Sequence, residues 1–388
     1  MKKLCYVFCI VFYILIHFNC VYAEEIKGMN AKAYVLIDAR SGRILCGHNE
    51  KEKMPMASTT KIMTCILAIE NTDNLKDNRC VAFSKRAAAM PDVQLDAVEG
   101  EKFYIKDLLY SLMLESHNDT AVAVAEGIGG SVEDFADMMN KKAEEIGAEN
   151  THFVTPNGLD SDEHYSTAYD MAIIARYAMK NEKFREIIKT GGYTFNSYKE
   201  NESGEIYKRY SVNNKDSFLN MMEGACGIKT GYTSKAGYCF VGALERGNRR
   251  FISVVLGCGW PPEKNKKWSD TKKLMQYGID NYKYNIIWDS NKFSKDIEVK
   301  DGEKKKCTLK AEGIGCYLMS PQDKYEIEYE IPEKIMSPVA ENEIVGSVKV
   351  HINTEIIGQF DIRAANEIKL TKMAFFKKKI SGFFACFF

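Results

Sequence analysis

Apolar and polar residues recur with two different periods along the chain, and the change of period divides it. Alternating residues on both sides of a turn at 39–42 predict a β-hairpin of strands 33–38 and 43–48. Apolar residues three and four apart then predict a series of helices. The expected helices cover residues 58–70, 106–115, 120–127, 167–180 and 269–282. A capping box, Ser131 to Asp134, marks the start of one more helix.

Strand patterns dominate the second half of the chain. Residues 238–244 and 251–256 predict two strong strands around the turn Arg246-Gly247-Asn248. From 289 to 368, short alternating segments are separated by turns, and no helical period is evident, so a separate all-β domain is expected there. We therefore divide the chain into residues 1–23, 24–285, 286–368 and 369–388.

The first 23 residues have the composition of an export signal. Lys2 and Lys3 form a basic start, an apolar run follows from 4 to 18, and Val21-Tyr22-Ala23 resembles a cleavage site. The alternative is a membrane-spanning anchor, but the apolar run is shorter than the roughly 20 residues that a span requires. We expect cleavage after Ala23 and export of the mature chain.

Composition weakens the case for several partner classes. The 53 basic and 53 acidic residues balance to a net charge of zero, so bulk electrostatics gives no reason to expect nucleic-acid binding. Three of the twelve cysteines lie in the leader, and the remaining nine include no C-x-x-C pair. Their spacing predicts neither a metal site nor a set of disulfides, so most are interpreted as small buried apolar residues.

The sequence gives little support for a zinc site or a catalytic triad built on histidine. The chain has no H-E-x-x-H motif of a zinc peptidase and no G-x-S-x-G elbow of an α/β-hydrolase. His164 and Asp170, in the stretch HYSTAYD, have a spacing more typical of a polar helix start than of a zinc-binding pair. A Ser–His–Asp triad stays open, because its members need not be close in sequence.

A serine activated by a lysine is the stronger candidate. In S-x-x-K on a helix the two side chains lie one turn apart on one face, where a neutral lysine can take the serine proton. The pattern occurs twice, at Ser58–Lys61 and at Ser269–Lys272. The first opens an apolar helix suited to the centre of a domain, whereas Ser269 is expected to cap a polar, lysine-rich helix. Ser58 is therefore the predicted nucleophile and Lys61 its base.

Two further motifs also occur twice. S-x-N appears as Ser116–Asn118 in an expected interhelical loop and as Ser211–Asn213 in a strand-like stretch. K-T-G appears at Lys189–Gly191, where a helix is expected to end, and at Lys229–Gly231, before a strong strand. On an edge strand, Lys229 would face a cleft, Thr230 would bind a carboxylate, and Gly231 would let a peptide ligand approach the backbone.

The first copy of S-x-x-K, the first S-x-N and the second K-T-G stand in the order found in penicillin-binding proteins and class A β-lactamases. The stretches MASTTKIMT, ESHNDTA, TPNGLD with HYSTAYDMA, and GIKTGYTSKAGYCF extend the likeness. From about Ala31 to Tyr284 the chain resembles the low-molecular-mass penicillin-binding proteins of the D-alanyl-D-alanine carboxypeptidase family (peptidase family S11). The resemblance implies an α+β, penicillin-binding/β-lactamase-like transpeptidase fold, an antiparallel sheet with helices. A small all-β domain and a C-terminal amphipathic helix are expected to follow.

The resemblance also implies acyl transfer in two steps. Ser58 would attack the carbonyl between two D-alanines while Lys61 takes its proton, Ser116 would help the terminal D-alanine to leave, and water would release the acyl group. Backbone N–H groups of Ser58 and Tyr232 would form the oxyanion hole. The expected catalytic residues are Ser58, Lys61, Ser116 and Asn118, and the expected substrate-binding residues are Lys229, Thr230, Gly231 and Tyr232.

No metal or cofactor is expected to take part, and the expected partners are a peptidoglycan stem peptide ending in D-Ala-D-Ala and β-lactam antibiotics. One stretch departs from the family pattern, in which a basic residue after the last strand of the domain helps to hold the substrate carboxylate. Lys264, Lys266 and Lys267 stand there, and the sequence does not choose between them.

Two other functions stay open. A β-lactamase would need fast deacylation, usually from a glutamate in an E-x-x-L-N stretch, and none occurs between Asn118 and Lys229. A non-catalytic wall-binding protein would use the same cleft, but the intact Ser58, Lys61 and Lys229 argue against it.

The C-terminal tail, 369–388, is basic and aromatic. On a helix, one face would carry Met373, Phe376, Ile380, Phe383, Phe384 and Phe387, with Lys372, Lys378 and Lys379 off that face. Such a helix suits the surface of an anionic membrane and is too lysine-rich to span it. We expect the tail to hold the exported chain on the outer face of the cytoplasmic membrane, in the cell-wall space. The alternative is a solvated tail or a helix packed on the β domain.

Overall fold

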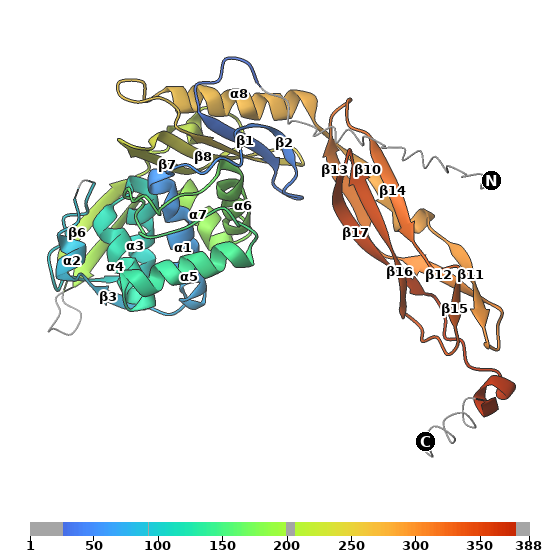
Figure 1. Cartoon of the computed structure of the whole chain (residues 1–388). Coiled ribbons are helices and arrows are strands. Elements are labelled where there is room, and N and C mark those ends of the chain that lie inside the picture. Colours follow the sequence, from blue (N-terminus) through green and yellow to red (C-terminus); the bar gives the residue numbers. More distant parts are fainter. Residues whose placement is uncertain (1–25, 92, 199–205, 378–388) are drawn as a thin grey trace, which may run out of the picture.

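The chain forms two bodies that meet where helix α8 (Lys266–Asn281) passes into strand β10 (Lys283–Asp289) (Figure 1). A computed structural model of the chain describes residues 26–91, 93–198 and 206–377. The expected leader, 1–23, and the tail from 378 onward lie outside these residues. Strand β10 crosses position 285, where the sequence was divided.

A five-stranded antiparallel sheet forms the centre of the first body, in the order β2-β1-β9-β8-β7. Its strands are β1 (Ala33–Asp38), β2 (Ile44–His48), β7 (Ala225–Thr233), β8 (Gly237–Arg246) and β9 (Arg249–Leu256). The predicted hairpin is confirmed as β1 and β2, and the two predicted strands are β8 and β9. Strand β7 lies at the edge of the sheet, where a strand presents backbone groups to a further chain.

Alternation along the strands gives this sheet two buried faces. Val35 and Ile37 join the core that contains α1 and its neighbours, whereas Tyr34 and Leu36 point to the other side, which α8 covers (Figure 1). The other helices are α1 (Lys61–Glu70), α2 (Lys85–Ala88), α3 (Ile105–Tyr110), α4 (Asn118–Gly129), α5 (Val132–Glu145), α6 (Ala168–Ala178) and α7 (Glu182–Lys189). A second sheet, in the order β3-β4-β5-β6, contains β3 (Cys80–Ala82), β4 (Lys102–Tyr104), β5 (Gly192–Tyr198) and β6 (Ile206–Asn213).

Local signals account for several helix ends. Ser131 caps α5 by accepting a hydrogen bond from the Asp134 N–H at 3.0 Å, as the capping box predicts. The helix predicted over 58–70 is confirmed, except that its first turn, η1 (Ala57–Thr60), is a 3-10 turn. The expected end of a helix at Lys189 is confirmed in α7.

One predicted helix start was wrong. Helix α8 begins at Lys266, so Ser269 lies inside the helix and does not cap it. The reason is the packing of Trp268, whose ring lies 4.7 Å from that of Phe240 on the central sheet. This contact is made before Ser269, so the preceding turn is already ordered against the core.

The second body is built almost wholly from strands (Figure 1). Six of them form a sheet in the order β14-β16-β17-β12-β11-β15, and β10 pairs with β13. Their bounds are β11 (Lys295–Lys300), β12 (Lys306–Ala311), β13 (Ile314–Met319), β14 (Tyr325–Glu330), β15 (Lys334–Met336), β16 (Ile344–Ile352) and β17 (Glu355–Ala364). Alternate residues such as Val348 and Val350 pack with Trp288 in a separate core. The predicted all-β character is confirmed.

Arg43 on the first body and Asp323 on the second form a bidentate ion pair between the two bodies. Their side chains are only 7% and 6% exposed. Arg43 also donates to the Leu318 carbonyl at 2.8 Å. Burial opposes ionisation of Asp323, but the hydrogen bond from Arg43 holds its pKa below the ordinary value. Directional contacts therefore join the two bodies.

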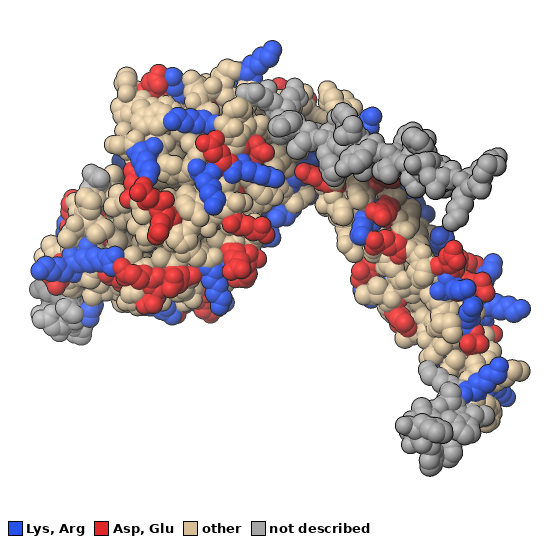
Figure 2. Space-filling view, viewed as in Figure 1, with Lys and Arg blue, Asp and Glu red and all other residues tan. Residues whose placement is uncertain are grey.

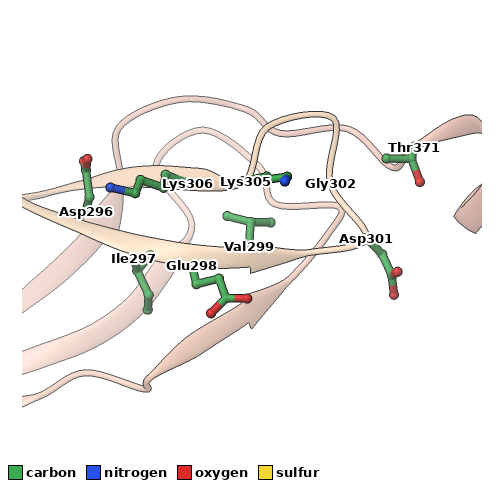
Figure 3. Close-up of a pocket in the computed structure, with 9 residues that line it drawn as sticks. All are labelled: Asp296, Ile297, Glu298, Val299, Asp301, Gly302, Lys305, Lys306 and Thr371. Carbon is green, nitrogen blue, oxygen red and sulfur yellow. The ribbon is translucent and has the colours of Figure 1, made fainter.

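A hollow of about 620 Å³ opens in the β body near the start of the tail (Figure 3). Its lining residues are Asp296, Ile297, Glu298, Val299, Asp301, Gly302, Lys305, Lys306 and Thr371. Side chains of both charges meet there, and no group of three metal-binding side chains occurs in the part of the chain that the structure describes. All copies of the three motifs lie in the first body, so the hollow has no part in their chemistry.

Residues 372–377 form a short helix at the end of the β body, away from the first body (Figure 1). Met373 and Phe376, on the predicted apolar face of the tail, are 72% and 64% exposed. Within residues 26–377, leaving out the gaps, no helix has the length and apolar character needed to cross a membrane. Positive and negative side chains are mixed over the visible face of both bodies, in keeping with the zero net charge (Figure 2).

Most of the cysteines in the part of the chain that the structure describes are buried, as interpreted from the sequence. Of the eight among the described residues, Cys46, Cys65, Cys226, Cys239, Cys258 and Cys307 are buried. They behave as small apolar core residues.

Candidate active site

Ser58 stands in the turn η1, just before α1 and beside the edge strand β7. The residue before it, Ala57, has a φ of 48°, a left-handed conformation that costs a residue with a side chain free energy. Ser58 is half-buried, whereas Thr59 and Thr60 behind it are buried. The turn therefore presents the Ser58 hydroxyl at the end of a buried helix.

Lys61 lies one turn behind Ser58 with its side chain fully buried. Its Nζ lies 2.8 Å from each of three oxygens: Ser58 Oγ, Asn118 Oδ1 and the carbonyl oxygen of Asn157. A neutral amine has two N–H donors and one lone pair. It can donate to Asn118 and Asn157 and accept from the Ser58 hydroxyl, which is the contact that a general base requires.

Electrostatics favours the neutral form of Lys61. Burial lowers its pKa well below the ordinary value, and the nearby Lys229 lowers it further, while Asp119 opposes both effects. A lower pKa leaves more of the free amine at neutral pH, and only the free amine can accept a proton.

Asn157 was missed in the sequence, because it contributes a backbone carbonyl rather than its side chain. The loop that carries it packs tightly on the serine turn. Gly158 has a φ of 85°, and a Cβ added there would lie 2.0 Å from the Ala57 carbonyl oxygen. Only the turn-forming Asn-Gly pair within TPNGLD marked the place.

The first S-x-N motif lies where a π turn, η3 (Ser111–Glu115), gives way to α4. Ser116 has a φ of 72°, which ends the first helix and redirects the chain. Asn118 donates its backbone N–H to the Val93 carbonyl at 2.8 Å and Nδ2 to the Pro91 carbonyl at 3.2 Å. These two contacts orient the amide so that Oδ1 reaches Lys61. The structure thus joins Asn118 to Ser58 through Lys61, with half-buried Ser116 on the same turn.

The second K-T-G motif lies on β7, on the edge of the sheet as predicted. Gly231 faces the serine turn, since a Cβ added there would lie 3.1 Å from the Ser58 nitrogen. Glycine therefore lets the strand lie against the nucleophile. Thr230 and Tyr232 point to the opposite face, and Tyr232 is 40% exposed with its ring 4.7 Å from Tyr238.

Lys229 brings a second buried lysine to the site, with 2% of its surface exposed. Burial lowers its pKa to about 8, although the Asp216 carboxylate acts in the opposite direction. Lys61 and Lys229 repel each other's charge. The arrangement therefore suits one neutral and one charged lysine near pH 7.

The histidines near the site are held as neutral structural groups. His117 Nδ1 lies 2.8 Å from Ser111 Oγ, and His164 Nε2 lies 2.9 Å from Thr60 Oγ1. Burial lowers both pKa values to about 4. The interpretation of His164 as helix-start polarity was wrong, because it supports the serine turn from a loop, whereas Asp170 does lie in the first turn of α6.

The duplicate motifs lie on other surfaces. Ser269 and Lys272 are both exposed on α8. Lys189 is exposed at the end of α7, and Ser211 on β6 lies 3.0 Å from Thr194 Oγ1. Of the two copies of S-x-x-K, S-x-N and K-T-G, one copy of each therefore lies at Ser58.

The three lysines after β9 differ in their surroundings. Lys264 is exposed, and Lys266 forms an ion pair with Glu263 at 2.6 Å. Lys267 is 8% exposed, and its Nζ lies 4.8 Å from the ring centre of Tyr238, the residue paired with Tyr232. Of the three, Lys267 is therefore the one turned toward the neighbourhood of β7.

Comparison with known proteins agrees with this arrangement. A family model described as D-alanyl-D-alanine carboxypeptidase matches residues 21–259, more than half of the chain, and one described as penicillin-binding protein 5, C-terminal domain, matches residues 282–370. The chain is 33% identical to D-alanyl-D-alanine carboxypeptidase DacF of Bacillus subtilis, over 91% of this chain and 89% of that protein. It is 30% identical to D-alanyl-D-alanine carboxypeptidase DacA of Haemophilus influenzae, over 88% and 86%.

Solved structures share the fold. Penicillin binding protein 5 from Haemophilus influenzae matches with a TM-score of 0.74 and 27% identity, over 89% of this chain and 99% of that one. The Streptomyces K15 DD-transpeptidase matches with a TM-score of 0.60 and 31% identity, over 66% of this chain and 100% of that one. The fold implied by the resemblance is confirmed.

Proposed function

This chain belongs to the D-alanyl-D-alanine carboxypeptidase family, and on that premise we propose that it is a serine-type enzyme acting through an acyl-enzyme on Ser58. Its substrate would be a peptidoglycan stem peptide that ends in D-Ala-D-Ala, from which it removes the last D-alanine. The proposal requires neither metal nor cofactor.

One observation carries the proposal: Lys61 lies 2.8 Å from Ser58 Oγ in a fully buried position that lowers its pKa. A serine hydroxyl is a weak nucleophile until a base takes its proton. Lys61 supplies that base, and Asn118 and Asn157 fix its direction.

Acylation would begin when Ser58 Oγ attacks the carbonyl carbon between the two D-alanines and its proton moves to Lys61. The negative charge on the carbonyl oxygen would be stabilised by the N–H groups of Ser58 and Tyr232. Loss of one such donor costs about 3 kcal/mol of transition-state stabilisation. When the C–N bond breaks, a proton passes to the leaving amine through Ser116, and D-alanine departs.

Deacylation would reverse these roles. A water molecule, losing a proton to Lys61, attacks the ester carbon, and the Ser58 oxygen leaves and is reprotonated. The products are the shortened peptide with a free carboxylate and regenerated enzyme. A β-lactam would acylate Ser58 in the same way, but its opened ring keeps the amine attached, so the adduct persists.

Carboxylate recognition would fall to the exposed edge of β7, which side chains from both faces of the strand can reach. Lys229 offers a buried cation and Thr230 a hydroxyl on the next residue, while Gly231 keeps the strand close to Ser58. We assign the additional basic residue to Lys267, because it alone of the three candidates is both buried and placed over Tyr238. A charged group freed from water makes the stronger contact with an anion.

We also propose an exported enzyme that is held at the outer face of the cytoplasmic membrane by its tail. The exposed Met373 and Phe376 and the exposed Lys372 of the terminal helix support this location. Truncation after Ile368 should move the protein from the membrane fraction to the soluble fraction. Retention of a truncated protein whose leader has been cleaved would show that the anchor lies elsewhere.

The direct test is to identify products from a pentapeptide ending in D-Ala-D-Ala by mass spectrometry. We expect free D-alanine and the tetrapeptide. Transfer of the acyl group to an added amine in place of water would indicate a transpeptidase. Rapid turnover of penicillin without peptide hydrolysis would indicate a β-lactamase, and binding without either reaction would indicate a non-catalytic protein.

A further inference from the structure

Asp216 is buried beside β7 with one of its two oxygens unused. It caps the turn η4 (Ser217–Asn220), where Oδ1 accepts a hydrogen bond from the Phe218 N–H at 2.9 Å. The residue is 7% exposed, and within the described residues Oδ2 has no well-aligned hydrogen bond, although the backbone N–H of Ile228 on β7 also acts on the carboxylate. A cap needs one oxygen, which serine or asparagine would supply without a charge. The buried negative charge therefore calls for a second explanation.

The register of β7 brings that charge to Lys229. A Cβ added at Gly227 would lie 2.8 Å from Asp216 Oδ2. Gly227 follows a shift of register in β7, and Lys229 stands two residues further on, about 7 Å along the strand. Asp216 thus lies beside the start of β7, near enough to Lys229 for the two charges to interact.

Lys229 lacks a strong partner of its own. Within the described residues its Nζ donates to the Thr230 carbonyl at 3.2 Å, and its side chain is buried next to a second lysine. A buried ammonium is costly unless an opposite charge accompanies it. Asp216 is placed to supply that charge.

We propose that Asp216 is a positioning residue whose carboxylate keeps Lys229 charged, so that the other buried lysine, Lys61, is the one that is free of a proton. Asp216 touches no reacting atom, and it acts through Lys229. The inference rests on the proposed function for its kinetic readout, since it assigns Lys229 to the substrate carboxylate and Lys61 to proton transfer.

The charged groups around Asp216 and Lys229 agree with a charged Lys229 and a neutral Lys61. Burial raises the pKa of Asp216 to about 6, with Lys229 and Lys267 acting against that rise. The Asp216 carboxylate in turn raises the pKa of Lys229 against burial. On the other side of the site, the charge of Lys229 lowers the pKa of Lys61 and the charge of Asp119 raises it. Both lysines lower the pKa of His117. Above about pH 6 the Asp216 carboxylate is ionised and can hold the proton on Lys229.

The test is the pH profile of kcat/KM for the pentapeptide in Asp216→Asn, which keeps the cap but removes the charge. In the wild type, activity should fall as pH rises through about 8, when Lys229 loses its proton. Without the carboxylate, Lys229 loses its proton more easily, so the alkaline midpoint should move down by about half a unit or more. We expect a loss of about two- to fivefold at pH 8 for a shift of half a unit to one unit, and convergence with the wild type near pH 6, where Lys229 is protonated in both enzymes.

Asp170→Asn is the matched control, because Asp170 is also a buried carboxylate that accepts a backbone hydrogen bond, from the Asn150 N–H, but has no lysine among the groups that shift its pKa. Its alkaline midpoint should stay at the wild-type value. If Asp216→Asn does not fold, Asp216→Ser keeps the cap and gives the same comparison.

An equal loss of activity at every pH would overturn the inference, since that is what a merely structural role predicts. A direct titration of the lysine Cε resonances by NMR reports on Lys229 whether or not the enzyme turns over. An unchanged Lys229 titration in Asp216→Asn would also overturn the inference. Absence of hydrolysis by the wild type would instead contradict the proposed function.

Discussion

Two segments of this chain carry the same S-x-x-K pattern and differ in almost every physical respect. At the start of α1, Lys61 is fully buried and its Nζ lies 2.8 Å from Ser58 Oγ. On α8, Ser269 and Lys272 stand in the same spacing on a helix but both are exposed to solvent. The spacing places the two groups near each other in both cases, so spacing alone does not make a site.

The two S-x-x-K copies differ in their burial and in the protein groups that replace water around them. At Ser58 the surrounding loops replace water with directed oxygens from Asn118 and Asn157, and a second lysine discourages the charged form of Lys61. On the exposed face of α8, water competes for every hydrogen bond that the two side chains could make. An S-x-x-K pair can therefore act as nucleophile and base where the fold excludes water from it and supplies fixed hydrogen-bond partners.

The two S-x-x-K copies should differ most in the effect of replacing their lysines, Lys61 and Lys272. Lys61→Ala should lower the rate constant for acylation by a fluorescent penicillin by about 10²–10⁴-fold, because it deletes the positioned base. Lys272→Ala should leave that rate unchanged. Far-ultraviolet circular dichroism checks that both variants are folded. A near-wild-type rate in Lys61→Ala would place the base elsewhere and remove the contrast between the two segments.

The two K-T-G copies should show the next largest difference. Lys229→Ala removes a buried cation from the substrate side of the cleft, and a hydrogen bond to a charged group contributes about 1.5–3 kcal/mol. We expect kcat/KM for the pentapeptide to fall by about 10–100-fold. Lys189→Ala, at the exposed end of α7, should match the wild type within twofold or so. Equal losses in both variants would contradict the assignment of β7 as the binding strand.

The pH dependence of acylation sharpens the contrast within the site itself. In the proposed mechanism Lys61 is neutral and Lys229 is charged, so the rate should fall when acid protonates Lys61 and again when alkali deprotonates Lys229. The second fall should be centred near pH 8, and the profile should be bell-shaped. A rate that rises steadily through pH 9 would show that the charge of Lys229 is not needed.

The smallest effect should come from the lysines after β9. Lys267→Met should raise KM for the pentapeptide about three- to tenfold, because Lys267 Nζ already donates to the Lys264 carbonyl and one further hydrogen bond contributes about 0.5–1.5 kcal/mol. Lys266→Met is the matched control, since that lysine is already paired with Glu263. A larger effect in Lys266→Met would reverse the assignment.

The sequence alone placed Ser58 and Lys61 at the start of a helix and Lys229 on an edge strand, because side chains follow the helix and strand periods. Asn118 was expected in an interhelical loop and is instead the first residue of α4. Asn157 could not be predicted, because it contacts Lys61 through its backbone carbonyl, a group that every residue has. Its position depends on the left-handed Gly158 and on close packing against Ala57, which are tertiary facts.

The error at Ser269 has a related cause. A serine before a helical run is a good cap candidate, but the start of α8 is decided by Trp268 packing on the central sheet. The role of His164 could not be seen either, since Thr60 is distant in sequence and becomes its partner only in the fold. Local rules identified the elements, and long-range contacts decided their ends and partners.

The central claim is that only the buried copy of S-x-x-K is a nucleophile, and intact-mass spectrometry after incubation with penicillin tests it most directly. Wild type and Ser269→Ala should each gain the mass of one penicillin, and peptide mapping should place it on Ser58. Ser58→Ala should gain none. An adduct that persists in Ser58→Ala, or that maps to Ser269, would contradict the account.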